Sequence, residues 1–165
     1  MSIWEKLFGQ KAAGGGGAAL SSEESEDLAA EPISRGRMDL IWFDPQTLSL
    51  LEITGGATVL TDDGGGGARD LHSTPEDIEW AKQVLVYSDK AQKAGERGDH
   101  QAAIRLYREA LKLAPGGDMF LMSMGCCYAN MGKPRIGIKY LQRAAEISPE
   151  NQRIRKNLAG VQKLL

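Results

Sequence analysis

The feature that most constrains the fold is an internal repeat with a period of 34 residues in the second half of the chain. Shifting the sequence by this period superimposes residues of the same type. The superimposed pairs include Gly98 with Gly132, Ile104 with Ile138, Ala110 with Ala144, and Pro115 with Pro149. This period is typical of a helix–turn–helix unit, which cannot bury its apolar face alone, so we expect successive units to stack.

Helix start and stop signals divide the repeat region into five predicted helices. Their ranges are about 75–95, 99–114, 118–131 and 134–147, with a fifth from about 151. Thr74, Asp99 and Asp118 are expected to cap the first three, because short polar side chains accept hydrogen bonds from free backbone N–H groups. Pro75 and Pro134 suit the first position of a helix.

Small residues recur where paired helices must approach each other closely, and larger ones recur where layers must be filled. The small ones are Ala91, Ala103, Gly125 and Gly137. The larger ones are Tyr107, Leu121, Tyr128 and Leu141. This alternation predicts a stacked array of helix pairs.

These residues resemble the tetratricopeptide repeat family over roughly residues 80–165. The first repeat carries "GD", "A-A-I-x-x-Y-x-x-A" and "L-x-P"; the second carries "L-x-x-x-G-x-x-Y", "G-K" and "I-x-P". The resemblance implies an all-α fold. We expect two helix–turn–helix repeats and a C-terminal capping helix in residues 75–165, preceded by a largely disordered glycine-rich N-terminal region.

The resemblance also implies a concave groove, lined by the first helix of each repeat, that binds a peptide or helix. Carried over by register, the predicted groove residues are Leu85, Ser88, Gln92, Met119, Met122, Ser123, Cys126, Asn130, Arg153 and Asn157. Some family members bind a carboxy-terminal carboxylate with a lysine and asparagines, but Ser88, Gln92 and Ser123 stand at those places here. Methionine favours an adaptable apolar surface, although Met119 and Met122 are equally compatible with core packing.

Charge and glycine separate the first 74 residues from the rest. Residues 1–74 hold 5 Lys and Arg against 12 Asp and Glu, whereas residues 75–165 hold 15 against 10. Glycine runs are costly to order and offer nothing to bury, so they predict flexible linkers. We therefore expect residues 12–37 to be a disordered glycine-rich and acidic linker, and residues 63–74 to be a second linker.

Two apolar segments interrupt these linkers. Residues 1–11 place Trp4, Leu7 and Phe8 on one face of a short helix, which suits docking to a protein or weak contact with a membrane surface, although a disordered start fits equally well. Residues 38–62 form the other segment. They are compatible with a hairpin turning at Gly55–Gly56 or with a helix starting near Asp44 and Pro45.

The sequence contains no recognisable catalytic, cofactor-binding or metal-binding pattern. The glycine runs lack the lysine and hydroxyl residue of a phosphate-binding loop, and Cys126 and Cys127 lack metal-ligand spacing. Adjacent cysteines do not form a relaxed disulfide in a helix, so a reducing compartment is expected. We expect a cytoplasmic location, with membrane association at the inner face as an extension through residues 1–10.

The sequence thus predicts a non-catalytic adaptor or chaperone-like module whose partner is another protein and not a nucleic acid. The alternative is a structural subunit that self-assembles or docks permanently into a larger complex, either membrane-associated or not. Because the two halves carry opposite charge, residues 38–62 are also expected to contact the repeats of the same chain, which would make them autoinhibitory. An unrelated protein as their target is equally compatible with the sequence.

Overall fold

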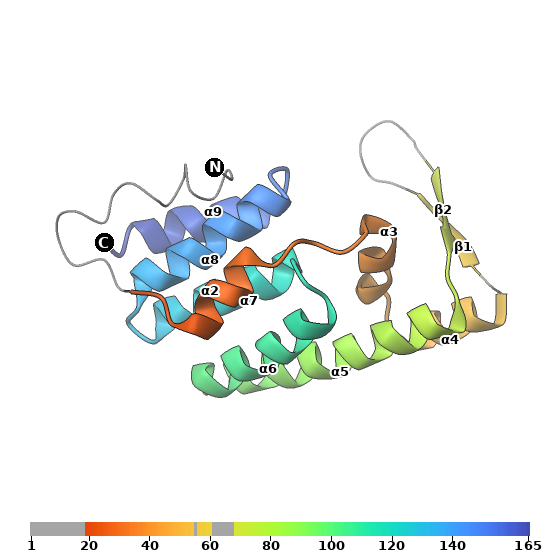
Figure 1. Cartoon of the computed structure of the whole chain (residues 1–165), viewed down its shortest axis with the longest axis horizontal. Coiled ribbons are helices and arrows are strands. Elements are labelled where there is room, and N and C mark those ends of the chain that lie inside the picture. Colours follow the sequence, from red (N-terminus) through yellow and green to blue (C-terminus); the bar gives the residue numbers. More distant parts are fainter. Residues whose placement is uncertain (1–18, 55, 61–67) are drawn as a thin grey trace.

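The computed structural model describes residues 19–54, 56–60 and 68–165. Its second half is a stack of helices, shown in Figure 1 in green to blue. They are α5 (Pro75–Glu96), α6 (His100–Leu113), α7 (Asp118–Asn130), α8 (Pro134–Ile147) and α9 (Gln152–Gln162). Helix α5 pairs with α6, α7 pairs with α8, and α9 packs on α8. The predicted helix pairs and terminal capping helix are confirmed.

Helix caps form largely where the sequence predicts them. The Thr74 hydroxyl accepts a hydrogen bond from the backbone N–H of Asp77, and the Asp77 carboxylate accepts one from the Thr74 N–H. Asp99 accepts from the Ala102 N–H at 3.0 Å. The prediction for Asp118 is wrong, because α7 starts one residue earlier in register and Gly117 is its N-cap.

Glycine and alanine set the spacing within the pairs. A Cβ on Gly137 would lie 2.5 Å from the backbone oxygen of Gly125, so α7 and α8 touch backbone to backbone. In the first pair, Ala91 and Ala103 are completely buried at the corresponding places. Gly98 and Gly132 end equivalent turns with φ of 81° and 75°, a region that favours glycine. The small residues therefore act as the sequence predicts.

The core runs through both repeats without a break. Its fully buried members include Ala110, Leu121, Met124, Tyr140, Leu141, Ala144 and Ile154. Tyr128 stacks on Tyr140 with ring centroids 5.2 Å apart, and Tyr107 stacks on Phe120 at 6.2 Å. Tyr107 and Phe120 connect α6 of the first helix pair with α7 of the second, whereas Tyr128 and Tyr140 connect α7 and α8 within the second. The stacking therefore contributes to packing both between and within helix pairs.

Residues 35–72 lie beside the N-terminal half of α5. They form α3 (Arg35–Met38), the 3-10 helix η1 (Asp39–Trp42), α4 (Pro45–Thr54) and the strands β1 (Gly56–Leu60) and β2 (Ala68–His72). Figure 1 shows these elements gathered at one end of the molecule. Helices η1 and α4 pack against α5, and their buried residues Leu40, Ile41, Leu48 and Leu51 belong to the same core as the repeats.

The helical alternative for this segment is correct, and the hairpin turning at Gly55–Gly56 is wrong. Asp44 starts α4 by accepting hydrogen bonds from the backbone N–H groups of Gln46 and Thr47. A hairpin does form, but β1 pairs with β2, with Gly56 opposite His72 and Leu60 opposite Ala68. The predicted linker 63–74 therefore includes a strand.

Trp80 contacts both the end of α6 and the segment that precedes α5. Its indole N–H donates to the backbone oxygen of Leu113, at the end of α6, over 2.8 Å. The Arg37 guanidinium lies 4.5 Å from the centre of the Trp80 ring and forms an ion pair with Asp77 at 3.0 Å. The indole thus satisfies a carbonyl that the end of a helix leaves free, while its face holds a cation.

The expected disorder of residues 12–37 is not met in the acidic stretch, because Ser22–Ala29 form helix α2. Ser21 and Glu24 make a capping box, in which each side chain accepts from the other residue's backbone N–H. Leu28 is 1% exposed, and the Asp27 carboxylate is buried among donors of α6 and α8. Long-range contacts thus order a stretch that its composition alone would leave unfolded.

Candidate functional site

The predicted groove residues come from three helices, α5, α7 and α9, and their exposure differs. Gln92, Asn130 and Arg153 are exposed. The half-buried members are Leu85, Ser88, Met119, Ser123, Cys126 and Asn157. Met122 is only 2% exposed, so its side chain belongs to the core and not to an open surface.

The structure brings the members from α7 and α9 together. These two helices pack against each other, and the Asn151 side chain that caps α9 approaches the sulfur of Met119 at 4.0 Å. Arg153 acts electrostatically on the Cys126 thiol. The surface shared by α7 and α9 thus combines the sulfur groups of α7 with a cation of α9.

Ser88 and Gln92 of α5 form hydrogen bonds within their own helix. The Ser88 hydroxyl donates to the backbone oxygen of Leu85 at 3.1 Å, and the Gln92 amide donates to Glu96 at 2.9 Å. These polar groups would have to exchange partners to hold a ligand. Binding a ligand on the α5 side of the predicted groove would therefore cost these hydrogen bonds.

Burial holds both cysteine thiols in their protonated form near neutral pH. It raises the pKa of Cys127 to about 11, with a further contribution from Cys126. The pKa of Cys126 is also raised by burial, against a lowering effect of Arg153. A protonated thiol is a weak nucleophile, so these residues act as small apolar groups.

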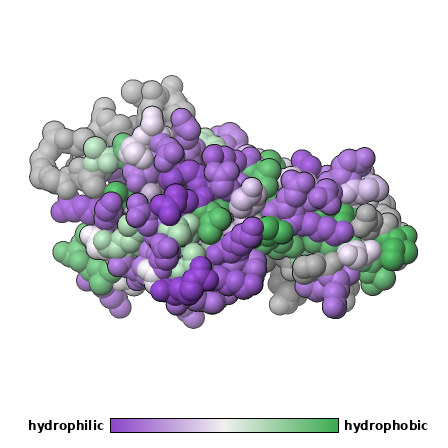
Figure 2. Space-filling view, turned by 90° about the horizontal axis from the view of Figure 1, so that it is seen from below, coloured by the Kyte–Doolittle hydropathy of each residue, from purple (hydrophilic) through white to green (hydrophobic). Residues whose placement is uncertain are grey.

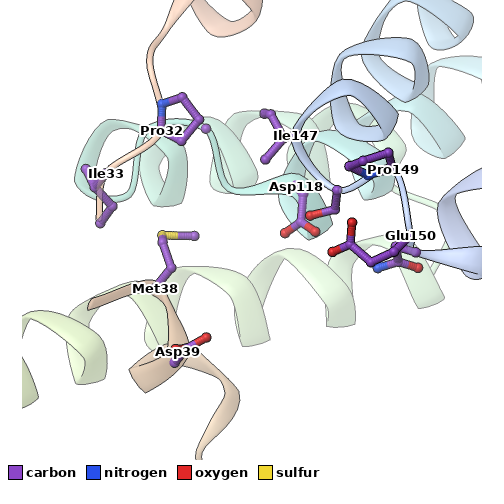
Figure 3. Close-up of a pocket in the computed structure, with 11 residues that line it drawn as sticks. Pro32, Ile33, Met38, Asp39, Asp118, Ile147, Pro149 and Glu150 are labelled. Carbon is purple, nitrogen blue, oxygen red and sulfur yellow. The ribbon is translucent and has the colours of Figure 1, made fainter. Parts of the chain in front are cut away.

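A hollow of about 550 Å³ opens beside the start of α7. Its walls come from the α2–α3 connection, from α3 and η1, from the α6–α7 turn and from the α8–α9 turn. The lining residues are Pro32, Ile33, Met38, Asp39, Gly116, Asp118, Ile147, Ser148, Pro149, Glu150 and Asn151. In Figure 3, Met38 and Asp39 lie across the hollow from Asp118, Pro149 and Glu150. The hollow adjoins the groove, because Met119 follows Asp118 directly.

The hollow combines apolar walls with three carboxylates. Asp118 accepts a hydrogen bond from the Met119 N–H, and Asn151 accepts from the N–H groups of Arg153 and Ile154. These bonds engage N–H groups at the starts of α7 and α9 that would otherwise attract an anion. Asp39, Asp118 and Glu150 contribute the three carboxylates of the lining.

Sequence reasoning missed the side of the hollow that comes from residues 32–39. No spacing rule connects these residues with the α8–α9 turn, more than a hundred positions away. The only available signal was the apolar character of residues 38–62. Trp4, Leu7 and Phe8, predicted for docking, lie outside the described residues.

Within the part of the chain that the structure describes, no helix has both the length and the apolar character needed to cross a membrane. This finding concerns only those residues.

Comparison with known families agrees with the helix pairs. Residues 86–116 and 120–151 match the model of the tetratricopeptide repeat, one match on α5–α6 and one on α7–α8. No curated protein sequence matches the chain. Repeats of this family generally bind other proteins and are generally non-catalytic. The chain therefore contains two tetratricopeptide repeats, one on α5–α6 and one on α7–α8.

Proposed function

We propose that this chain is a non-catalytic adaptor or chaperone-like module that binds a peptide or helix of another protein along α7 and α9. The observation that carries the proposal is the half-exposed face of α7. Met119, Ser123 and Cys126 follow one another along this face, and Arg153 of the neighbouring helix α9 lies beside it. Half-exposed apolar groups next to exposed polar ones are typical of helix-in-groove recognition.

The lining of the hollow favours one kind of side chain in the ligand. Its apolar walls suit the stem of a long side chain, and its three carboxylates suit a cationic end. We therefore expect the bound segment to place a lysine or arginine in the hollow and apolar residues over Met119 and Cys126. Arg153, farther along the groove, favours an acidic residue there.

The experiment selects ligands without assuming their identity. A phage-displayed library of random peptides is panned against the full-length chain, and the selected peptides are measured by fluorescence anisotropy. Ser123→Arg should weaken binding at least about tenfold, because it fills the face of α7. Ala159→Arg is the matched control, since residue 159 is exposed two positions beyond Asn157 and so points away from the groove.

Glu150→Lys tests the hollow separately, and it should weaken only peptides that carry a basic residue. Equal binding by the wild type and the Ser123→Arg variant would contradict binding along α7. Selected peptides without basic residues would contradict the role assigned to the hollow while leaving the groove in place.

The alternative function, a structural subunit, is favoured by exposed apolar residues on α4. Leu50 is 60% exposed and Ile53 is 82% exposed, one helical turn apart. Figure 2 shows apolar surface at the end of the molecule that carries α4. Sedimentation velocity at rising concentration distinguishes the two functions: a monomer throughout supports the adaptor, and association abolished by Ile53→Glu supports the subunit.

Location and tethering remain part of the proposal. Two free cysteines fit a reducing compartment such as the cytoplasm. Docking through Trp4, Leu7 and Phe8, to a protein or at the inner face of a membrane, stays a prediction from the sequence. So does the autoinhibitory role of residues 38–62, which requires that a ligand displace η1 and α4 from α5.

A further inference from the structure

Helix α2 is held by a cluster of hydrogen-bond donors that belongs to both repeats. The Asp27 carboxylate accepts from Nε of Arg108 at 2.8 Å and from the Tyr140 hydroxyl at 2.6 Å. Arg108 lies on α6 of the first repeat and Tyr140 on α8 of the second. One carboxylate therefore connects two repeats, with partners 81 and 113 positions later in the sequence.

Further hydrogen bonds from arginine side chains hold α2 at both of its ends. A second nitrogen of Arg108 donates to Glu23 at 3.0 Å, and Arg143 of α8 donates to the backbone oxygen of Ala30 at 3.1 Å. Both arginine side chains are only 13% exposed. A surface that presents buried guanidinium groups and a phenol selects an acidic segment with helical carbonyls to offer.

Helix α2 does not satisfy this surface completely. The Nε of Arg143 is buried and has no hydrogen-bond acceptor among the described residues. A buried donor without a partner is costly, so a segment with one more acceptor at that place would bind better. The surface therefore has an unused recognition group next to its present occupant.

Helix α2 is also short and has few buried residues. It has eight residues, too few to be a stable helix alone in water. Only Asp27 and Leu28 are buried. Detachment would expose Leu28 and break the polar cluster, and Leu20, which precedes the helix, would also lose its packing on the core.

We infer that the surface of α6 and α8 around Arg108, Tyr140 and Arg143 is a second protein-binding site, for an acidic helix that presents a carboxylate followed by leucine. Helix α2 occupies it within the same chain and yields to a partner segment of that chemistry. This site does not depend on the proposed groove, which lies along α7 and α9.

The probe for this site is a fluorescent peptide with the sequence of residues 19–31, added to the full-length chain. In the wild type, α2 competes from within the chain at an effective concentration on the order of millimolar, so the peptide binds weakly. Asp27→Asn removes the charge that holds α2 and should improve peptide binding at least about tenfold. Glu26→Gln is the matched control, because Glu26 is exposed on the same helix, and it should leave binding unchanged.

A further variant locates the peptide. Adding Arg108→Gln to Asp27→Asn should abolish the gain, because the peptide's own aspartate then loses its main partner. If the Asp27→Asn protein retains its helical circular dichroism and binds the peptide no better than the wild type, the inference is overturned.

A second measurement covers the case in which Asp27→Asn unfolds. Nuclear magnetic resonance of the labelled wild-type chain follows the amides of α2 as unlabelled peptide is added to several millimolar. Displacement moves the amides of Glu24 to Leu28 toward coil positions and supports the exchange. Amides of α2 that stay unchanged at that concentration show that α2 is a fixed part of the fold.

Discussion

The repeat helices and the N-terminal segments are held by different kinds of contact. Helices α5–α9 join through a continuous apolar core in which small residues allow close backbone approach. Helix α2 is attached by one buried leucine and a polar cluster, and η1 and α4 are attached along one side of α5. We infer that α5–α9 form a platform from which the preceding segments can detach. Helix α2 contributes a single buried leucine, and η1 and α4, whose buried residues belong to the same core, pack mainly on one helix of the platform.

The largest expected effect comes from a charge placed inside the platform. Ala144 is completely buried in α8, so Ala144→Asp would bury an unpaired carboxylate at a cost of roughly 3–5 kcal/mol. We expect the whole repeat unit to unfold, measured as loss of helical circular dichroism at 25 °C. Ala159→Asp on the exposed side of α9 is the control and should melt like the wild type; normal melting of both would refute the register.

A smaller effect is expected where α7 and α8 touch. Gly137→Val places a side chain 2.5 Å from the backbone oxygen of Gly125, which should lower the free energy of unfolding by about 1–3 kcal/mol. Chemical denaturation measures the loss. Gly160→Ala, at an exposed helical position with open space around it, should instead leave stability unchanged or increase it. An equally tolerated Gly137→Val would show that the helices can separate.

The turn glycines should have a still smaller effect. Gly98 has a φ of 81° and no neighbouring atom within 4 Å of an added Cβ, so Gly98→Ala introduces only backbone strain, about 1 kcal/mol. Gly132→Ala, the equivalent change in the second repeat, should cost the same. Thermal melting of both variants tests this equivalence, and a clear difference would mean that the two turns are not alike.

The smallest effect on the platform is expected from the attached segment. Leu48→Ala removes a completely buried side chain of α4 and should release that helix from α5. Limited proteolysis should then cut the chain between residues 43 and 54, while the melting temperature of the repeats changes little. Melting of the repeats and of α4 together, at a much lower temperature, would contradict the separation of the two regions.

Much of the platform could be predicted from the sequence, because its signals are local or periodic. Asp99 caps the helix that it precedes, and Ala110 and Ala144 occupy equivalent buried places one repeat apart. The groove was predicted less well, since register alone does not distinguish Met122 in the core from Met119 beside it. Exposure at such positions depends on how α6, α8 and α9 pack around α7.

The attachment of α2 could not be predicted from composition. An acidic segment lacks the apolar surface needed to fold alone, and its order depends on Arg108 and Tyr140, far away in the sequence. One local signal was present, the capping box of Ser21 and Glu24. It indicates where a helix can start but not that a partner surface exists.

Hydrogen–deuterium exchange on the full-length wild type, followed by mass spectrometry of peptides, tests the platform most directly. Amides of α6, α7 and α8 should exchange slowest and at similar rates, because they open only when the whole repeat unit opens. Amides of α2 and α4 should exchange at least about tenfold faster, through local detachment. Protection of α2 equal to that of α7 and α8 would contradict the account, since the segment would then be an inseparable part of the platform.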